Sequence, residues 1–128
     1  MTDIDKLIHD LGQPGGDYAR DRELSYQFAV ALKWAFHPLA LVRGEFTLPF
    51  WTDPNGNYHL QRPLFTRDLT AIVNTLRGVD RIYSISAFPV ESSAAIGQMT
   101  ATDKWHYAPT AERALMIARL VLKQETGK

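Results

Sequence analysis

The residues best suited to binding chemistry gather in one stretch of the chain, Leu39 to Phe65. Phe50 and Trp51 are neighbours there, and Tyr58 and His59 follow after an interval that reads Asp-Pro-Asn-Gly over 53–56. Clustered aromatic rings serve two purposes in proteins: they anchor interfaces, or they fill small cores because each ring buries a large area. Both purposes stay open for this stretch, with core packing slightly favoured.

Arginines near the aromatic stretch add to the interface interpretation. Arg43, Arg62 and Arg67 could surround a partner surface, where arginine is enriched, or they could be ordinary solvated charges. We therefore take six candidate binding residues: Arg43, Phe50, Trp51, Tyr58, His59 and Arg62.

The side chains most often used in metal sites and in catalysis do not form a recognisable pattern. The four histidines are isolated and lack the i, i+4 spacing of a helical metal site: His9, His37, His59 and His106. Ser92 and Ser93 lack the flanking glycines of a nucleophile elbow, and the chain has no cysteine. The sequence therefore predicts no metal site, no cofactor and no catalytic residues, and it favours a protein that is not an enzyme.

Three glycines, Gly12, Gly15 and Gly16, come just before a predicted helix and raise the question of a phosphate-binding loop. They follow a helix rather than a strand, so the geometry of such a loop is not expected. A plain, flexible linker is the simpler interpretation. The acidic residues that come next, Asp17 and Asp21, suit the positive end of a helix dipole.

Length and charge restrict the class of protein. The chain has 128 residues, the size of one domain, with 14 basic and 14 acidic side chains. This balance gives no long-range attraction for a nucleic acid, which is therefore unsupported as a partner. The N-terminus is acidic where a secretion signal is basic, and no apolar run reaches the roughly 20 residues of a membrane span. We expect one domain, residues 1–128, in the cytosol and without a membrane partner.

Apolar residues at helical spacing predict two helices near the N-terminus. The first runs over Ile4–Leu11, and Gly12 is expected to end it. The second runs from about Asp21 to Trp34. It is expected to end at His37 and Pro38, because the residue before proline is disfavoured in the α conformation.

Two more helices are predicted from threonine caps. Thr66 is expected to cap the third helix, with Gly78 at its end, and Thr110 is expected to cap the last. Alternating apolar and small residues predict antiparallel strands between these helices, over Ile82–Phe88 and Ala94–Ala101.

Other extended segments are predicted from weaker patterns. Lys104–Tyr107 could add a third strand to the antiparallel pair. Leu41–Phe50 and Tyr58–Leu60 read as extended segments joined by a turn over Asp53–Gly56. The order of helices and strands predicts the α+β class.

Two segments resemble a known family. Residues 65–72 read Phe-Thr-Arg-Asp-Leu-Thr-Ala-Ile, and residues 110–118 read Thr-Ala-Glu-Arg-Ala-Leu-Met-Ile-Ala. The first resembles the aromatic-Thr-x-x-Leu-x-Ala helix start of the phage ABA sandwich domain, a family of small phage and prophage proteins. The second resembles its Thr-x-x-x-Ala-Leu-x-x-Ala final helix. The resemblance covers Leu64–Lys123, with weaker agreement over 21–34. The chain departs from the family at Ala111, often proline there, and at Thr70, often acidic.

The resemblance implies an α-β-α layered sandwich with a small antiparallel sheet. It also implies phage origin. Together with the small size of the chain and the lack of a catalytic constellation, this origin favours a phage or prophage accessory protein that acts in the host-cell cytosol by binding a host or phage protein. Inhibition of a bacterial defence system such as CRISPR-Cas is the most concrete form of this hypothesis. The family has no established catalytic residues to carry over. Two alternatives stay open: a small-molecule binding protein or nucleotide sponge formed at the interface of a homo-oligomer, and a small enzyme.

Overall fold

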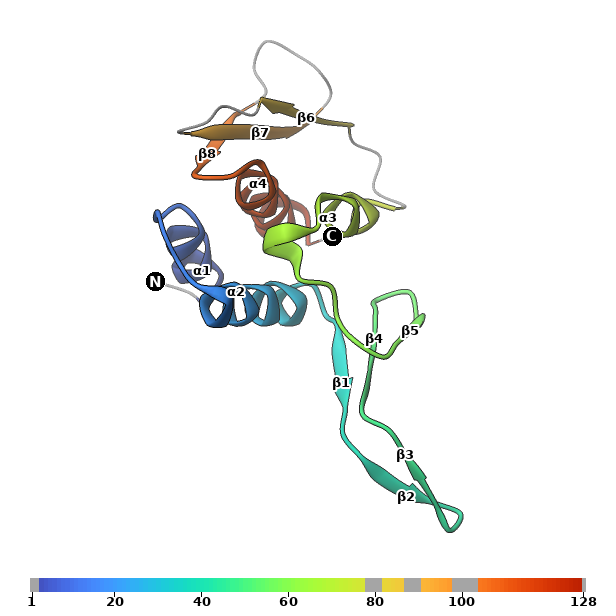
Figure 1. Ribbon diagram of the computed structural model, residues 1–128. Helices are drawn as coiled ribbons and strands as arrows, with labels where there is room; N and C mark the ends of the chain where they lie inside the picture. The colour runs from blue at the N-terminus through green and yellow to red at the C-terminus, as the bar shows by residue number, and fades with distance from the viewer. Residues whose placement is uncertain (1–2, 78–81, 87–90, 98–103, 128) are drawn as a thin grey trace.

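The computed structural model describes residues 3–77, 82–86, 91–97 and 104–127, and α4 (Ala111–Thr126) lies at its centre (Figure 1). Every residue from Arg113 to Leu120 is buried, so this helix is covered on all sides. Thr110 Oγ1 accepts a hydrogen bond from the Arg113 amide at 3.2 Å. At the other end Gly127 adopts the left-handed conformation, with a φ of 74°. The predicted last helix and its threonine cap are confirmed.

A three-stranded antiparallel sheet packs on one side of α4. β6 (Ile82–Ser86) pairs with β7 (Ser92–Gly97), which pairs in turn with β8 (His106–Ala108). Ala94 of β7 and Ala108 of β8 are buried in the core, where small side chains allow α4 to lie close to the sheet. The predicted strand pair and the third strand are confirmed, but β7 begins two residues earlier than expected, at Ser92, and β8 begins two residues later than expected, at His106. Their expected ends at residues 87–88 and 98–101 lie outside the described residues.

Two helices lie on the other side of α4: α1 (Asp3–Leu11) and α2 (Tyr18–Ala31). With α4 they form one apolar core, which includes Leu7, Leu11, Leu24, Phe28 and Leu115. Figure 1 shows the sheet, then α4, then α1 and α2, with no described helix on the far face of the sheet. The α+β class is confirmed. The α-β-α layering is not confirmed, because the described helices lie on one side of this sheet.

The third helix begins later than predicted. A 3-10 turn, η1 (Phe65–Arg67), comes first, and α3 (Leu69–Asn74) follows and packs chiefly against α4. The cap is Asp68, whose carboxylate accepts a hydrogen bond from an amide of the first turn at 3.0 Å. The prediction that Thr66 caps this helix was wrong, because Thr66 lies within the 3-10 turn and is buried. The expected end at Gly78 lies outside the described residues.

The second helix also differs from its prediction, because it ends at Ala31 rather than Trp34. Lys33 adopts the left-handed conformation, with a φ of 70°, and the Trp34 amide donates to the Ala29 carbonyl oxygen at 3.0 Å. This is a Schellman arrangement, which ends a helix without help from a proline. Its left-handed position is usually glycine, so no residue type signals this end in the sequence. The helix begins earlier than expected, behind Asp17 as its cap.

A long two-stranded ribbon projects from the helical body (Figure 1), and we call its residues, 35–52, the β-arm. In the half next to the helices, β1 (Ala35–His37) pairs with β4 (Phe50–Thr52). In the outer half, β2 (Ala40–Val42) pairs with β3 (Glu45–Thr47).

One register runs through the whole β-arm and sets Pro38 opposite Pro49. Proline has no N–H group to donate, so the ladder is interrupted there. At the tip, Arg43 and Gly44 both have a positive φ, 52° and 81°, as a tight two-residue hairpin turn requires. The prediction of one extended segment over Leu41–Phe50 was therefore wrong, because the chain reverses direction at Arg43.

β4 also pairs with β5 (Tyr58–His59), and the connection between them is the predicted turn. Asp53 Oδ1 accepts hydrogen bonds from the amides of Asn55 and Asn57, each at 2.9 Å. Gly56 supplies the positive φ, 85°, that the turn needs. The hairpin on this turn is confirmed.

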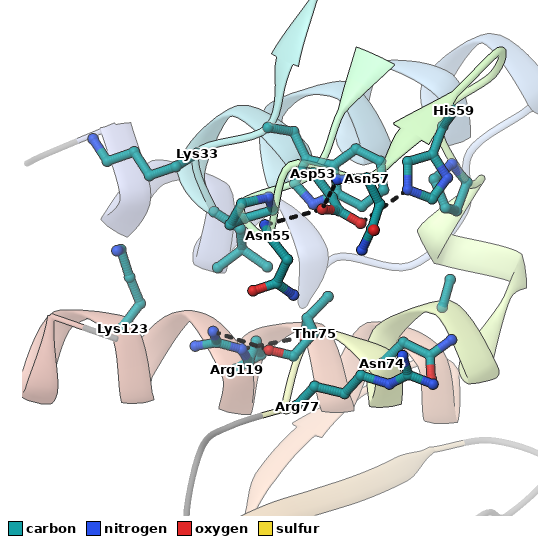
Figure 2. Close-up of a pocket in the computed structure, with 15 residues that line it drawn as sticks. Lys33, Asp53, Asn55, Asn57, His59, Asn74, Thr75, Arg77, Arg119 and Lys123 are labelled. Atoms are coloured by element: carbon teal, nitrogen blue, oxygen red, sulfur yellow. Dashed lines mark hydrogen bonds and ion pairs between the residues drawn. The ribbon is translucent and has the colours of Figure 1, made fainter.

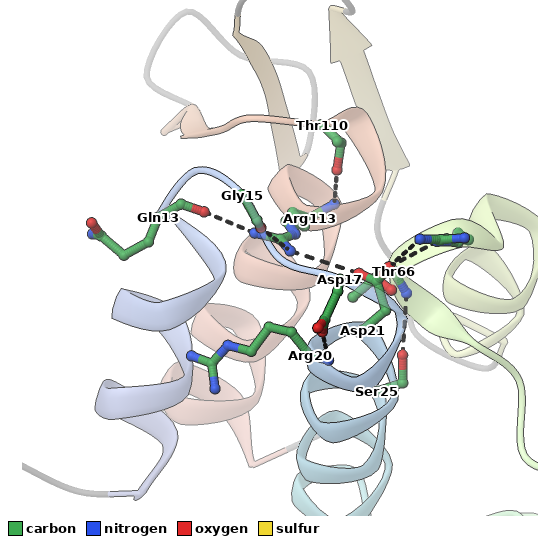
Figure 3. Close-up of polar contacts among 10 residues, drawn as sticks. Gln13, Gly15, Asp17, Arg20, Asp21, Ser25, Thr66, Thr110 and Arg113 are labelled. Carbon is green, nitrogen blue, oxygen red and sulfur yellow. Dashed lines mark hydrogen bonds and ion pairs between the residues drawn. The ribbon is translucent and has the colours of Figure 1, made fainter.

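The linker between α1 and α2 is held by buried Arg113 (Figure 3). The guanidinium donates to the carbonyl oxygens of Gln13, at 2.8 Å, and Gly15, at 3.0 Å. It also lies 3.7 Å from the carboxylate of Asp21, which pairs with Arg67 at 2.7 Å. These linker carbonyls face a cation of the protein itself, which fits a structural linker better than a phosphate-binding loop. The linker is thus fixed to α4 instead of being a flexible break.

Candidate functional site

The outer half of the β-arm exposes apolar side chains on one face. Leu41 and Phe46 lie opposite each other in the ladder and are 63% and 74% exposed. Leu39 and Leu48, 56% and 67% exposed, extend this row because each lies two residues along its chain segment from one of them. We call these four residues the apolar arm face. A two-stranded ribbon is only marginally stable without a layer over its apolar side, so this surface is suited to a partner.

A groove of about 700 Å³ lies where the β-arm meets α2, and Trp51 lines it. Trp51 is only 8% exposed, with the Tyr26 ring edge-on at 5.9 Å and the Phe36 ring at 5.1 Å. The Arg62 guanidinium lies over the rings of Trp51 and Tyr26, at 5.8 and 5.7 Å from their centres. Trp51 therefore closes a small aromatic cluster beside the main core and is not an exposed anchor.

Arg62 adds fixed charge to this groove. Burial lowers the pKa of Arg62 and so does the neighbouring Arg22, while Glu23 acts in the opposite direction. The Arg62 Nη2 donates to the carbonyl oxygen of Arg22 at 3.0 Å. An arginine remains protonated even after such shifts, so the groove combines aromatic rings with permanent positive charge.

Phe50 and Tyr58 pack on the opposite face of the β-arm from Trp51, because successive strand residues alternate. Their rings are 4.8 Å apart, and the His37 ring stacks on Phe50 at 4.5 Å. His37 Nε2 lies 3.0 Å from Thr52 Oγ1. This cluster stabilises the strands at the base of the arm and leaves Tyr58 exposed.

A second hollow, of about 560 Å³, lies between the turn that joins β4 to β5 and the helices α3 and α4 (Figure 2). We call it the cationic cavity, because its described lining includes one carboxylate, Asp53, and four basic side chains: Lys33, Arg77, Arg119 and Lys123. Figure 2 shows Lys33 and Asp53 on one wall and Arg119 and Lys123 on the other. The cavity therefore carries an excess of positive charge.

Arg119 is the most deeply buried of these cations, at 4% exposure. Its Nε donates to Thr75 Oγ1 at 3.2 Å, and its Nη2 donates to the Thr75 carbonyl oxygen at 3.3 Å. Burial lowers the pKa of Arg119, but the guanidinium remains protonated. A cation in a wall of low dielectric attracts an anion more strongly than a fully solvated cation does.

Asp53 and His59 build the opposite wall of the cationic cavity. His59 Nε2 lies 3.0 Å from Asp53 Oδ2. Burial acts to raise the pKa of Asp53, but the hydrogen bonds from His59 and from Asn57 and Asn55 outweigh burial and hold this pKa below its ordinary value. The His59 ring also lies 4.8 Å from the Trp34 ring. Asp53 is therefore ionised, and its carboxylate already accepts hydrogen bonds from His59 and from two amides of its own turn.

The structure brings two pairs of the six candidate binding residues together. Trp51 meets Arg62 in the groove, and Phe50 meets Tyr58 on the other face of the arm. His59 lies opposite Trp51 in the ladder of β4 and β5 but lines the cationic cavity. Arg43 lies apart from the others, at the tip of the β-arm.

Sequence reasoning missed the cationic cavity. Arg119 and Lys123 are four residues apart on one helix and lie beside its apolar residues, which is a usable signal for two cations on one face. Lys33 and Arg77 follow the ends of α2 and α3, and no local pattern places them together.

The described residues contain no group of three or more metal-binding side chains that could hold an ion. No helix in the same part of the chain is long and apolar enough to cross a bilayer. In comparisons with known proteins, the chain matches no family model, no curated protein sequence and no solved structure.

Proposed function

We propose that the protein is a binding module that attaches to another protein through its β-arm. One observation carries this proposal: the four residues of the apolar arm face are each more than half exposed, on a ribbon that extends away from the helical body (Figure 1). Single exposed apolar residues are ordinary on protein surfaces. A contiguous row of them on a projecting element is typical of an interaction surface.

The partner we propose offers an apolar groove into which the β-arm inserts. The outer half of the arm carries only two charged side chains, Arg43 and Glu45, both next to its tip. Burial of apolar surface, rather than charge, therefore supplies most of the affinity.

The resemblance to the phage ABA sandwich domain supports a setting for this binding. We propose a phage or prophage accessory protein in the host cytosol whose partner belongs to a bacterial defence system such as CRISPR-Cas. The resemblance rests on residues 65–72 and 110–118. These residues form η1, the start of α3 and the first half of α4, which belong to the helical body that supports the arm.

Substitution of both Leu41 and Phe46 by threonine tests the proposal. The double variant removes the centre of the apolar arm face and keeps residues that favour strands. The control is Tyr83→Thr, which removes a large side chain, 43% exposed, from β6. Produced in a bacterium with active CRISPR-Cas, the parent and the control should restore plaque formation by a targeted phage. The double variant should not restore it.

Photo-crosslinking from position 46 in the same cells identifies the partner. A crosslink to a protein of the defence system supports the proposal in full. If the parent does not restore plaques but crosslinks to some other protein, binding through the arm stands and the defence setting is rejected. Crosslinks between two copies of this chain alone, or a double variant as active as the parent, would reject the arm as a surface for another protein.

A further inference from the structure

The described lining of the cationic cavity includes no residue of the β-arm, and the size and charge of the cavity suit a ligand of its own. Its volume of about 560 Å³ falls within the range of about 300 to 1,000 Å³ that is typical of small-molecule sites. The single carboxylate in its described lining, Asp53, is already engaged by His59 and by two amides of its own turn. The positive charges of Lys33 and Arg77 therefore remain available to an anion, and Lys123 adds a third cation whose Nζ also donates to the Gly127 carbonyl oxygen at 3.0 Å.

Lys33 is the residue that points most directly to a ligand. Its φ of 70° is a conformation in which glycine or asparagine would end α2 without strain. Figure 2 shows Lys33 at the same end of the cavity as Lys123, on the opposite wall. Strained residues other than glycine are concentrated at binding sites, where the side chain itself is needed. The backbone conformation at position 33 favours glycine or asparagine, but the residue is a lysine that lines the cavity. We take this as a sign that the lysine side chain is needed there.

The rest of the lining is polar and aromatic. The side-chain amides of Asn55, Asn57 and Asn74 can both donate and accept hydrogen bonds. The rings of Trp34 and His59 add flat surfaces of the kind on which a planar group stacks. One cavity therefore combines cations with groups that recognise a heterocycle.

We propose that the cationic cavity binds a small organic phosphate of nucleotide size. Lys33, Arg77 and Lys123 hold the phosphate, since lysine and arginine are the usual phosphate ligands in proteins. The asparagine amides and the two rings contact the planar part of the ligand. This site lies within a single chain, unlike the nucleotide site at a homo-oligomer interface that was one alternative from the sequence.

Calorimetric titration at constant ionic strength tests the proposal with three probes: adenosine monophosphate, inorganic phosphate and adenosine. The parent protein should bind adenosine monophosphate saturably, more tightly than inorganic phosphate, and should not bind adenosine. The key variant is Lys33→Gly, and its matched control is Arg43→Gly. Each replaces a basic residue of positive φ by glycine, which removes one charge and relieves strain, but only Lys33 lines the cavity.

Lys33→Gly should fold at least as well as the parent and bind adenosine monophosphate about tenfold more weakly, the loss expected for one charge-assisted hydrogen bond. Arg77→Gln, a change at an exposed cavity residue, should weaken it similarly, whereas Arg43→Gly should bind like the parent. The proposal is overturned if the parent binds neither phosphate compound at millimolar concentration, or if Lys33→Gly and Arg77→Gln both keep the affinity of the parent. Adenosine monophosphate binding no tighter than inorganic phosphate would also overturn it.

Discussion

Asp21 of α2 and Arg113 of α4 lie 3.7 Å apart in the interior, and their side chains are only 9% and 6% exposed. Arg113 also donates to two carbonyl oxygens of the linker after α1, so one guanidinium joins α1, α2 and α4 (Figure 3). A buried charge of this kind is costly to leave without partners. The arginine therefore keeps three helices in one arrangement.

Arg113→Met should lower the free energy of unfolding by about 3 kcal/mol, because the buried Asp21 loses one of its two cations and two linker carbonyls lose their donor. Arg20→Met is the matched control, since the Arg20 side chain is 42% exposed and, among the described residues, pairs with Asp10 at 3.4 Å. It should cost less than about 1 kcal/mol. Denaturant unfolding of both variants measures the difference, and equal losses would contradict the structural role of Arg113.

Asp53→Asn should weaken the hairpin of β4 and β5 and change how stability depends on pH. The pKa of Asp53 is held below its ordinary 3.8, so this carboxylate contributes stability above that value and loses it as the pH falls through the folded-state pKa. At neutral pH the variant should be less stable by about 1 kcal/mol. Below a pH of about 4 its melting curve should approach that of the parent.

Glu45→Gln is the control for Asp53→Asn, since Glu45 is an exposed carboxylate of the β-arm. Thermal unfolding should show the same acid dependence for this control as for the parent. If the difference between Asp53→Asn and the parent is the same at acid and neutral pH, the carboxylate charge does not stabilise the turn.

Asp68 has the capping role that the sequence suggested for Thr66. Thr66 is 5% exposed, and its Oγ1 makes no hydrogen bond with any other part of the described chain. Thr66→Val should therefore be neutral or stabilise the protein by up to about 1 kcal/mol, because it removes a buried polar group without a partner. Asp68→Ala should cost about 1 kcal/mol, the usual loss for an N-cap. Unfolding of the two variants in denaturant measures both free energies. A larger loss of stability for Thr66→Val than for Asp68→Ala would support Thr66 as the cap after all.

The elements of the C-terminal half could be predicted because their signals are local. The cap of α4 depends on Thr110 and an amide three residues away. In the sheet, Ile85 lies opposite Ala94, and both contact the core, as alternation along a strand requires. Patterns that repeat over a few residues were sufficient for these elements.

The β-arm and the cationic cavity could not be predicted in the same way. Lys33 occupies a left-handed conformation that usually marks glycine, so its residue type does not signal the end of α2. In the turn of the arm only Gly44 is a signal, because its left-handed neighbour is Arg43 rather than the asparagine or aspartate typical of such turns. The arm also continues one register past two opposed prolines, which break the sequence pattern. The cavity needs tertiary contacts between the turn at Asp53 and α4, and these are not encoded in any single segment.

The last prediction separates the residues that fold the β-arm from those that bind through it. Trp51 is 8% exposed and packs with the rings of Tyr26 and Phe36, whereas Phe46 is 74% exposed. Trp51→Ala should lower the free energy of unfolding by about 3 kcal/mol, at the lower end for a large ring because its cluster lies beside the main core. Phe46→Ala should stay within about 0.5 kcal/mol of the parent.

Denaturant unfolding of the two variants, followed by far-UV circular dichroism, measures these values, and the plaque assay measures the protection of the phage that depends on binding. Phe46→Ala should fold like the parent and lose protection of the phage, because a central interface residue contributes about 2 kcal/mol or more to binding. If Trp51→Ala instead keeps its stability and Phe46→Ala keeps its activity, the roles of the two residues are reversed. The partner would then contact the groove around Trp51, where Arg62 lies over the indole, rather than the outer half of the β-arm.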